Sequence, residues 1–69
     1  MPESVYKIVE VVGSSTDSWE RAAQVAVETA SQSLRDLRVA EVSALDLHIE
    51  KGKIVAYRAK LRLSFKYEP

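Results

Sequence analysis

The 69-residue sequence contains no cysteine, one histidine, one tryptophan, two glycines and two prolines. The absence of cysteine excludes disulfides and thiolate metal sites, and it suits a reducing compartment. A single histidine argues against a histidine-based catalytic metal site. The sequence therefore lacks the cross-links and the metal ligands that stabilise many proteins of this size.

The sequence also lacks an excess of charge of one sign and lacks long apolar runs. Ten basic and ten acidic residues give a formal net charge of zero, which argues against nucleic-acid binding. No apolar run approaches the roughly 20 residues needed to span a bilayer, so no membrane association is expected. The first five residues show no basic start followed by an apolar stretch, and we expect a cytoplasmic protein without a secretory leader.

The length predicts one small domain, residues 1–69. A chain of this size buries only roughly 60% of its unfolded surface on folding. Proteins this small usually add disulfides, a metal or oligomerisation. Oligomerisation is the support that the composition leaves, so we expect the chain to bind copies of itself.

Hydrophobic patterning predicts one strand and one helix in the first half of the chain. Residues 4–12 are rich in β-branched side chains and indicate a strand. Asp17 and Glu20 have the spacing of a capping box, with Asp17 as the N-cap. Apolar residues then recur at helical spacing, which predicts a helix over about 18–37 whose buried face is mostly alanine.

The second half predicts two long strands, 38–50 and 53–67, joined by a turn at 51–52. In the second strand apolar residues at alternate positions from Val55 to Tyr67 share one face, and Arg58, Lys60, Arg62 and Lys66 share the other. The order strand–helix–strand–strand predicts an α+β fold (β-α-β-β) in which a three-stranded antiparallel sheet wraps around one helix. A 20-residue helix is about 30 Å long. Fifteen strand residues span about 50 Å, so the hairpin should project beyond the helix.

A two-residue turn predicts the register of this hairpin. Glu41 then pairs with Arg62 on the outer face, away from the helix. The inner face receives three pairs of the two strands: Ala40–Leu63, Val42–Leu61 and Ala44–Ala59. Near the tip the pattern inverts. The following residues are then expected on the outer face: Leu47, Ile49, Ile54 and Ala56. Asp46, His48 and Glu50 are expected on the inner face, and this inversion indicates packing against a second copy of the chain.

Two segments have residue types that bind ions, and each has a plainer interpretation. Residues 13–16 precede the helix and could hold a phosphate on backbone N–H groups, but they lack the P-loop spacing and lysine, so a turn and cap is the simpler interpretation. Asp46, His48 and Glu50 could ligate a cation, calcium or magnesium before zinc, with Asp46 and Glu50 as the oxygen ligands. A solvated strand tip explains the same pattern.

The remaining candidates do not indicate an enzyme. Arg58, Lys60, Arg62 and Lys66 form a basic ladder that could hold an anion or could be a solvated face with ion pairs. Trp19 is expected to pack over the sheet, with stacking on a ligand as the alternative. His48 has no serine or cysteine nucleophile near it in the sequence, so catalysis is not expected.

Much of the sequence is similar to one known family. The segments that carry the similarity are VYKIVEVVGSST at 5–16, SWE at 18–20, LRDLR at 34–38, EV at 41–42, HIE at 48–50, GK at 52–53, and Tyr57, Leu61 and Phe65. This pattern resembles the dodecin family over nearly the whole chain without gaps. The resemblance implies a hollow homododecamer that binds flavins (riboflavin, FMN or FAD) in pairs between subunits for storage, and coenzyme A in some members.

The family positions for the flavin site correspond here to Val39, Glu41, Asp46 and Arg58. Val39 stands where the family has its flavin-stacking tryptophan, Arg58 where it has glutamine, and Asp46 where it commonly has a basic residue. Loss of an indole removes a large stacking surface. The chain therefore resembles the calcium-dodecin branch, and it is expected to store a small ligand while binding flavin weakly or not at all. A calcium-binding or purely structural dodecamer is the alternative.

Overall fold

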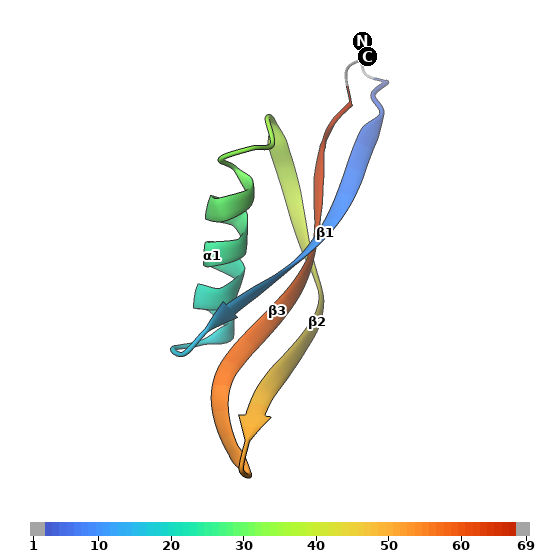
Figure 1. Cartoon of the computed structure of the whole chain (residues 1–69). Helices are drawn as coiled ribbons and strands as arrows, with labels where there is room; N and C mark the ends of the chain where they lie inside the picture. The colour runs from blue at the N-terminus through green and yellow to red at the C-terminus, as the bar shows by residue number, and fades with distance from the viewer. Residues whose placement is uncertain (1–2, 68–69) are drawn as a thin grey trace.

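Four elements follow one another in the computed structural model, which describes residues 3–67. They are β1 (Tyr6–Ser15), α1 (Trp19–Ala30), β2 (Leu37–Glu50) and β3 (Lys53–Lys66) (Figure 1). The expected β-α-β-β order and the three-stranded antiparallel sheet are confirmed. Residues 1, 2, 68 and 69 of the expected domain lie outside the described range.

β3 is the central strand of the sheet, in the order β1-β3-β2, and both of its pairings are antiparallel. Its alternation has the predicted effect. Ala59, Leu61 and Leu63 face α1 and are at most 1% exposed, whereas the residues between them are exposed or half-buried. We call the side of the sheet that faces α1 the inner face, and the opposite side the outer face.

Gly13 and the alanines of α1 bring the helix unusually close to the sheet. A Cβ atom at Gly13 would overlap the carbonyl oxygen of Ala22 and would lie 2.9 Å from the Cβ of Ala26. Ala22 and Ala26 are themselves buried. Glycine on β1 is therefore required by a close approach of backbones, as the alanine-rich helix face predicts.

The N-cap of α1 is Ser18, so the prediction of Asp17 was wrong. Ser18 has extended backbone angles, and its Oγ accepts a hydrogen bond from the Arg21 N–H at 3.0 Å. The Asp17 N–H instead donates to Ser15 Oγ at 2.9 Å within the preceding turn. Residues 13–16 thus form the end of β1 and a turn that leads to the cap at Ser18, in agreement with the simpler of their two interpretations.

The helix ends at Ala30, so the predicted end near residue 37 was also wrong. Ser31 Oγ donates to the Val27 carbonyl at 2.7 Å, and Ser33 Oγ donates to the Ala30 carbonyl at 3.5 Å. Serine side chains that bond to nearby backbone compete with helix continuation. Asp36 then adopts a left-handed backbone, with φ 58°, and the chain turns into β2.

The β2–β3 hairpin projects well beyond α1, as predicted (Figure 1). The molecule measures 53 × 20 × 16 Å, and its long axis follows the hairpin. Lys51 and Gly52 both have positive φ, 53° and 74°, which is the geometry of a two-residue hairpin turn. Within residues 3–67, no helix is long and apolar enough to cross a membrane.

The predicted register is wrong for residues 44–48 of β2 and correct for Glu41 and Val42 before them and for Ile49 and Glu50 after them. Glu50 pairs with Lys53 and Glu41 with Arg62, as predicted. Irregularities between Val42 and Ala44 and between His48 and Ile49 shift the intervening segment by one position. The shift also overturns the prediction for Ala44, which now lies opposite Lys60.

The shifted segment also overturns the predicted faces of Asp46, Leu47 and His48 near the tip. Asp46 lies opposite Arg58 on the outer face, and Leu47 lies opposite Tyr57 on the inner face. His48 follows Asp46 on the outer face. The bulge thus keeps leucines on the inner side of the hairpin and charged residues on the outer side.

Candidate functional site

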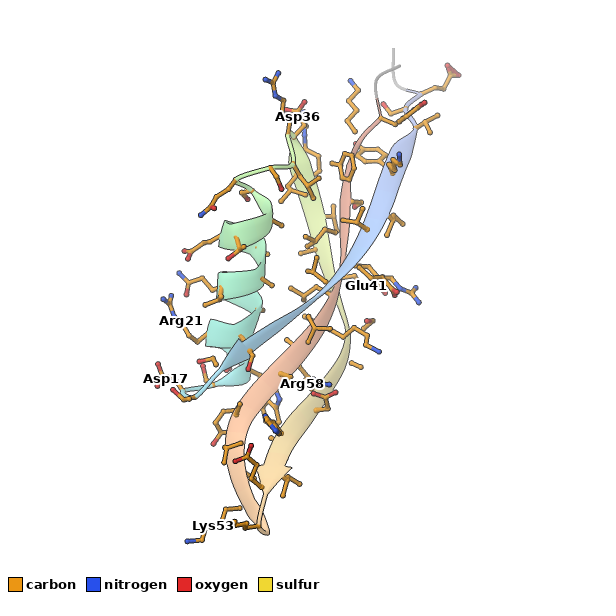
Figure 2. The ribbon with its side chains drawn as sticks, viewed as in Figure 1. Asp17, Arg21, Asp36, Glu41, Lys53 and Arg58 are labelled. Carbon is orange, nitrogen blue, oxygen red and sulfur yellow. The ribbon has the colours of Figure 1, made fainter. Side chains whose placement is uncertain are left out.

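The outer face of the sheet brings together the four residues that the family resemblance identifies. Three-strand rows, read from β1 through β3 to β2, define this face. The rows are Ile8–Ser64–Val39, Glu10–Arg62–Glu41, Val12–Lys60–Ala44 and Ser14–Arg58–Asp46. Glu41 points away from α1 in Figure 2. Val39 and Arg58 thus lie on the outer face, as predicted, at opposite ends of this array.

Arg58 and Asp46 form a two-pronged ion pair on the outer face. Arg58 Nε donates to Asp46 Oδ1 at 2.7 Å, and Nη2 donates to Oδ2 at 2.9 Å. The hydrogen bonds from Arg58 hold the pKa of Asp46 below its ordinary value, and Asp46 in turn raises the pKa of Arg58. The side chains are 44% and 48% exposed, so solvent screens the attraction, but the fork geometry fixes both groups.

The two neighbouring rows contain Lys60 and Arg62 of the basic ladder, and Lys66 lies beyond the four rows, opposite Tyr6. Arg62 Nε donates to Glu10 Oε2 at 3.2 Å, and Glu41 lies opposite Arg62 on the other side. Lys60 lies between Val12 and Ala44. The ion pairs of Arg58 and Arg62 agree with the interpretation of the ladder as a solvated face with ion pairs.

Trp19 supports the Asp46 segment from the inner side. Its Nε1 donates to the Asp46 carbonyl at 3.1 Å, and its ring meets Tyr57 edge-on with centroids 5.3 Å apart. The expected packing of Trp19 over the sheet is thus observed. Its ring also lines an open groove of about 280 Å³ with Ala23, Val42 and Leu45. Asp46 is consequently held by its side chain on one face and by its backbone on the other.

The expected metal ligands are not brought together within one chain. Asp46 is bound to Arg58, whereas Glu50 lies 3.5 Å from His48 Nε2 at the tip of the hairpin. Residues 3–67 contain no group of three or more carboxylate, histidine or cysteine side chains placed to hold a metal ion. A metal at Asp46 or Glu50 would need ligands from further copies of the chain.

Sequence reasoning missed the Asp46–Arg58 pair and the bond from Trp19 to Asp46. Both depend on the bulge near Ser43, which moves Asp46 to the outer face. One signal was present in the sequence. The straight register places Leu45 opposite Arg58, whereas a one-residue slip replaces this mismatch with opposite charges.

The elements and the site together define a class: a small α+β protein in which one helix packs on a three-stranded antiparallel sheet whose outer face carries paired charges. Comparison with known proteins agrees with this class. The family model described as Dodecin matches residues 5–68. The chain therefore belongs to the dodecin family.

Two relatives describe the similarity in more detail. Calcium dodecin of Mycobacterium tuberculosis is 44% identical over 66 residues, which cover 96% of this chain and 93% of the relative. Its crystal structure, described as having a novel calcium-binding site, matches with a TM-score of 0.83 and 48% identity over 96% of this chain and 94% of that one. Dodecin from Streptomyces coelicolor matches with a TM-score of 0.91 and 38% identity, covering 100% of this chain and 99% of that one.

Proposed function

We propose that the chain forms a homododecamer that binds and stores a small ligand, and that its flavin site is degenerate, so that flavin binds weakly or not at all. In this proposal the protein is a single-domain, cytoplasmic binding protein without catalytic activity. One observation carries the proposal: two outer-face positions of the family's flavin site hold residues that suit flavin poorly. Val39 is aliphatic, and the guanidinium of Arg58 is already bound to Asp46.

The apolar surface of the single chain supports assembly. Among residues 3–67 the buried apolar core is small: Ala22, Ala26, Ala56, Ala59, Leu61 and Leu63. Large apolar side chains remain half or more exposed on both faces, including Val39 and Ile8 on the outer face and Leu45 on the inner face. Burial of such surface contributes about 25 cal/mol per Å². Copies of the chain, packed as in a closed symmetric oligomer, are the simplest partner for both faces.

The side chain at position 39 supports weak flavin binding. Val39 is 60% exposed and presents two methyl groups where an indole would present a stacking surface. Aromatic stacking contributes roughly 1 kcal/mol beyond the area that it buries, and two copies at an interface would double this loss. A flavin ring bound here would also have to compete with Asp46 for the donors of Arg58.

Native mass spectrometry followed by flavin titration tests the proposal. We expect a mass of twelve chains, and any excess mass identifies a resident ligand. Riboflavin and FMN fluorescence should be quenched weakly by the wild-type protein and at least about tenfold more tightly by Val39→Trp, with Val39→Leu as the control without an aromatic ring. A monomer or dimer, or tight quenching at one flavin per wild-type chain, would contradict the proposal.

A calcium-binding assembly is the second candidate, favoured by the relative named calcium dodecin and by the exposed carboxylates of Asp46 and Glu50. Oxygen anions suit a hard cation. If Asp46 is a ligand, calcium must displace Arg58, so Arg58→Gln should tighten calcium binding measured by calorimetry. Arg62→Gln frees Glu10 instead and serves as the control. Absence of saturable heat together with unchanged thermal unfolding would remove calcium binding and leave the purely structural assembly.

A further inference from the structure

The Asp46–Arg58 pair uses two donors of the guanidinium and both oxygens of the carboxylate. We infer that Asp46 masks Arg58 and thereby makes the outer face select against anionic ligands such as phosphate esters, so that Asp46 and Arg58 together determine specificity. This inference deepens the proposed function and rests on its placing of the ligand site on the outer face.

The charges of the outer face show why an anion gains little attraction there. Its four rows contain three cations, Arg58, Lys60 and Arg62, and three carboxylates, Glu10, Glu41 and Asp46. The resulting net charge is zero. Two of the three cations are bound to carboxylates, at 2.7 Å and 3.2 Å between the closest atoms. A phosphate that approaches this face therefore gains little long-range attraction, and it must break an existing fork to reach Arg58.

The pair is held in place from both sides of the sheet. Arg58 lies on the central strand, and Asp46 lies within the segment of β2 that is shifted by one residue between two bulges. Trp19 Nε1 fixes the backbone of Asp46 from the inner face at 3.1 Å. Because this anchoring fixes the backbone that carries the carboxylate, Asp46 remains within reach of Arg58 when a ligand approaches. A competing anion must therefore replace two charge-assisted hydrogen bonds rather than one.

Removal of the Asp46 charge should convert the same surface into an anion site. An unpaired guanidinium presents a planar fork that matches two oxygens of a phosphate group. The four rows would then carry three cations and two carboxylates, a net charge of +1, with Lys60 in the next row along β3. Asp46→Asn keeps the size of the side chain and removes its charge, so it is the variant that separates charge from packing.

Arginine-specific labelling with phenylglyoxal, followed by peptide mass spectrometry, measures the mask directly on the assembled protein. In the wild type Arg58 should react slowly, and pyrophosphate should not protect it. In Asp46→Asn it should react about tenfold faster, and pyrophosphate should protect it. Glu10→Gln is the matched control, because it frees Arg62 and should accelerate labelling at Arg62 alone.

Three outcomes would overturn the inference: equal labelling of Arg58 in the wild type and in Asp46→Asn, protection of wild-type Arg58 by pyrophosphate, or no protection in the variant. If Asp46→Asn fails to fold, the wild-type protein still tests the inference, because protection of Arg58 in it or a preference for FMN over riboflavin would contradict masking. Failure of the proposed function is seen separately, in the mass and flavin affinity of the wild-type protein, which do not depend on the labelling.

Discussion

Leu61 and Val42 are cross-strand partners on the same face of the sheet, yet Leu61 is 1% exposed and Val42 is 51% exposed. The difference arises because α1 packs mainly on β1 and β3 and leaves β2 largely open. One half of the inner face is therefore completed within the chain. The other half remains exposed in the single chain. This contrast separates residues that form the core of the chain from residues that remain available for assembly or binding.

The largest loss of stability should come from Gly13→Ala. This variant changes the covered half of the inner face, at the point where the strand and helix backbones are closest. The new Cβ would overlap the Ala22 carbonyl, and neither backbone has room to move without breaking the core. We expect a loss of about 4 kcal/mol or more, or failure to fold. Thermal unfolding at fixed protein concentration measures the effect.

Gly52→Ala is the control for this variant. Gly52 has φ 74° but no atoms near its missing Cβ, so only backbone strain of about 1 kcal/mol should appear. Equal losses in the two variants would show that the close helix–strand approach is not what requires glycine at position 13.

The next prediction compares one variant at each of the two cross-strand partners, Leu61 and Val42. Leu61→Ala removes a buried side chain and should cost about 3 kcal/mol of stability wherever the chain folds. Val42→Ala should leave the fold intact and lower the temperature at which the proposed oligomer dissociates, because Val42 is half exposed in the single chain and would be buried by a partner in that oligomer. Size-exclusion chromatography during heating distinguishes the two, and a loss of fold in both variants would contradict the division of the inner face.

How far the sequence predicts this division depends on the range of the interactions involved. The alternation along β3 identified its buried residues, since a central strand with one face packed and the other face solvated obeys a simple period of two. The helix end was mispredicted because the bonds of Ser31 and Ser33 to the backbone are local choices that apolar periodicity does not report.

The sequence predicted only part of the candidate site, namely the pairing that can be counted from the hairpin turn. The pairing of Glu41 with Arg62 follows from counting residues from the turn, and it is correct. Asp46 was placed on the wrong face because the bulge near Ser43 shifts this segment by one residue. Trp19 contacts the shifted segment from the inner side through Tyr57 and the Asp46 carbonyl. Residue spacing alone contains no information about that contact.

A smaller effect is expected from Trp19→Phe, at the boundary between the covered and the projecting parts of the hairpin. Phenylalanine retains an aromatic ring against Tyr57 but lacks the Nε1 donor to Asp46. We expect a loss of about 1 kcal/mol, which is typical of one hydrogen bond, and faster hydrogen exchange in residues 44–48. Tyr57→Phe keeps the ring contact and should change neither quantity. Unchanged exchange in Trp19→Phe would mean that the bulge itself holds the hairpin.

The smallest effect should be a dependence of stability on pH that belongs to the Asp46–Arg58 pair. Hydrogen bonds from Arg58 lower the pKa of Asp46 below its ordinary value of 3.8 in the folded chain. A carboxylate with a lowered folded pKa contributes stability that is present above pH 3.8 and is lost as the pH falls through the folded pKa. Wild-type protein should therefore be more stable than Asp46→Asn at neutral pH, and the difference should shrink below pH 3.8.

Arg58→Gln removes the same pair from its other side and should abolish the same pH dependence. Because both side chains are about half exposed, the difference should also fall with added salt. A difference between wild type and Asp46→Asn that is constant from neutral to acid pH would place the role of Asp46 in packing rather than in charge.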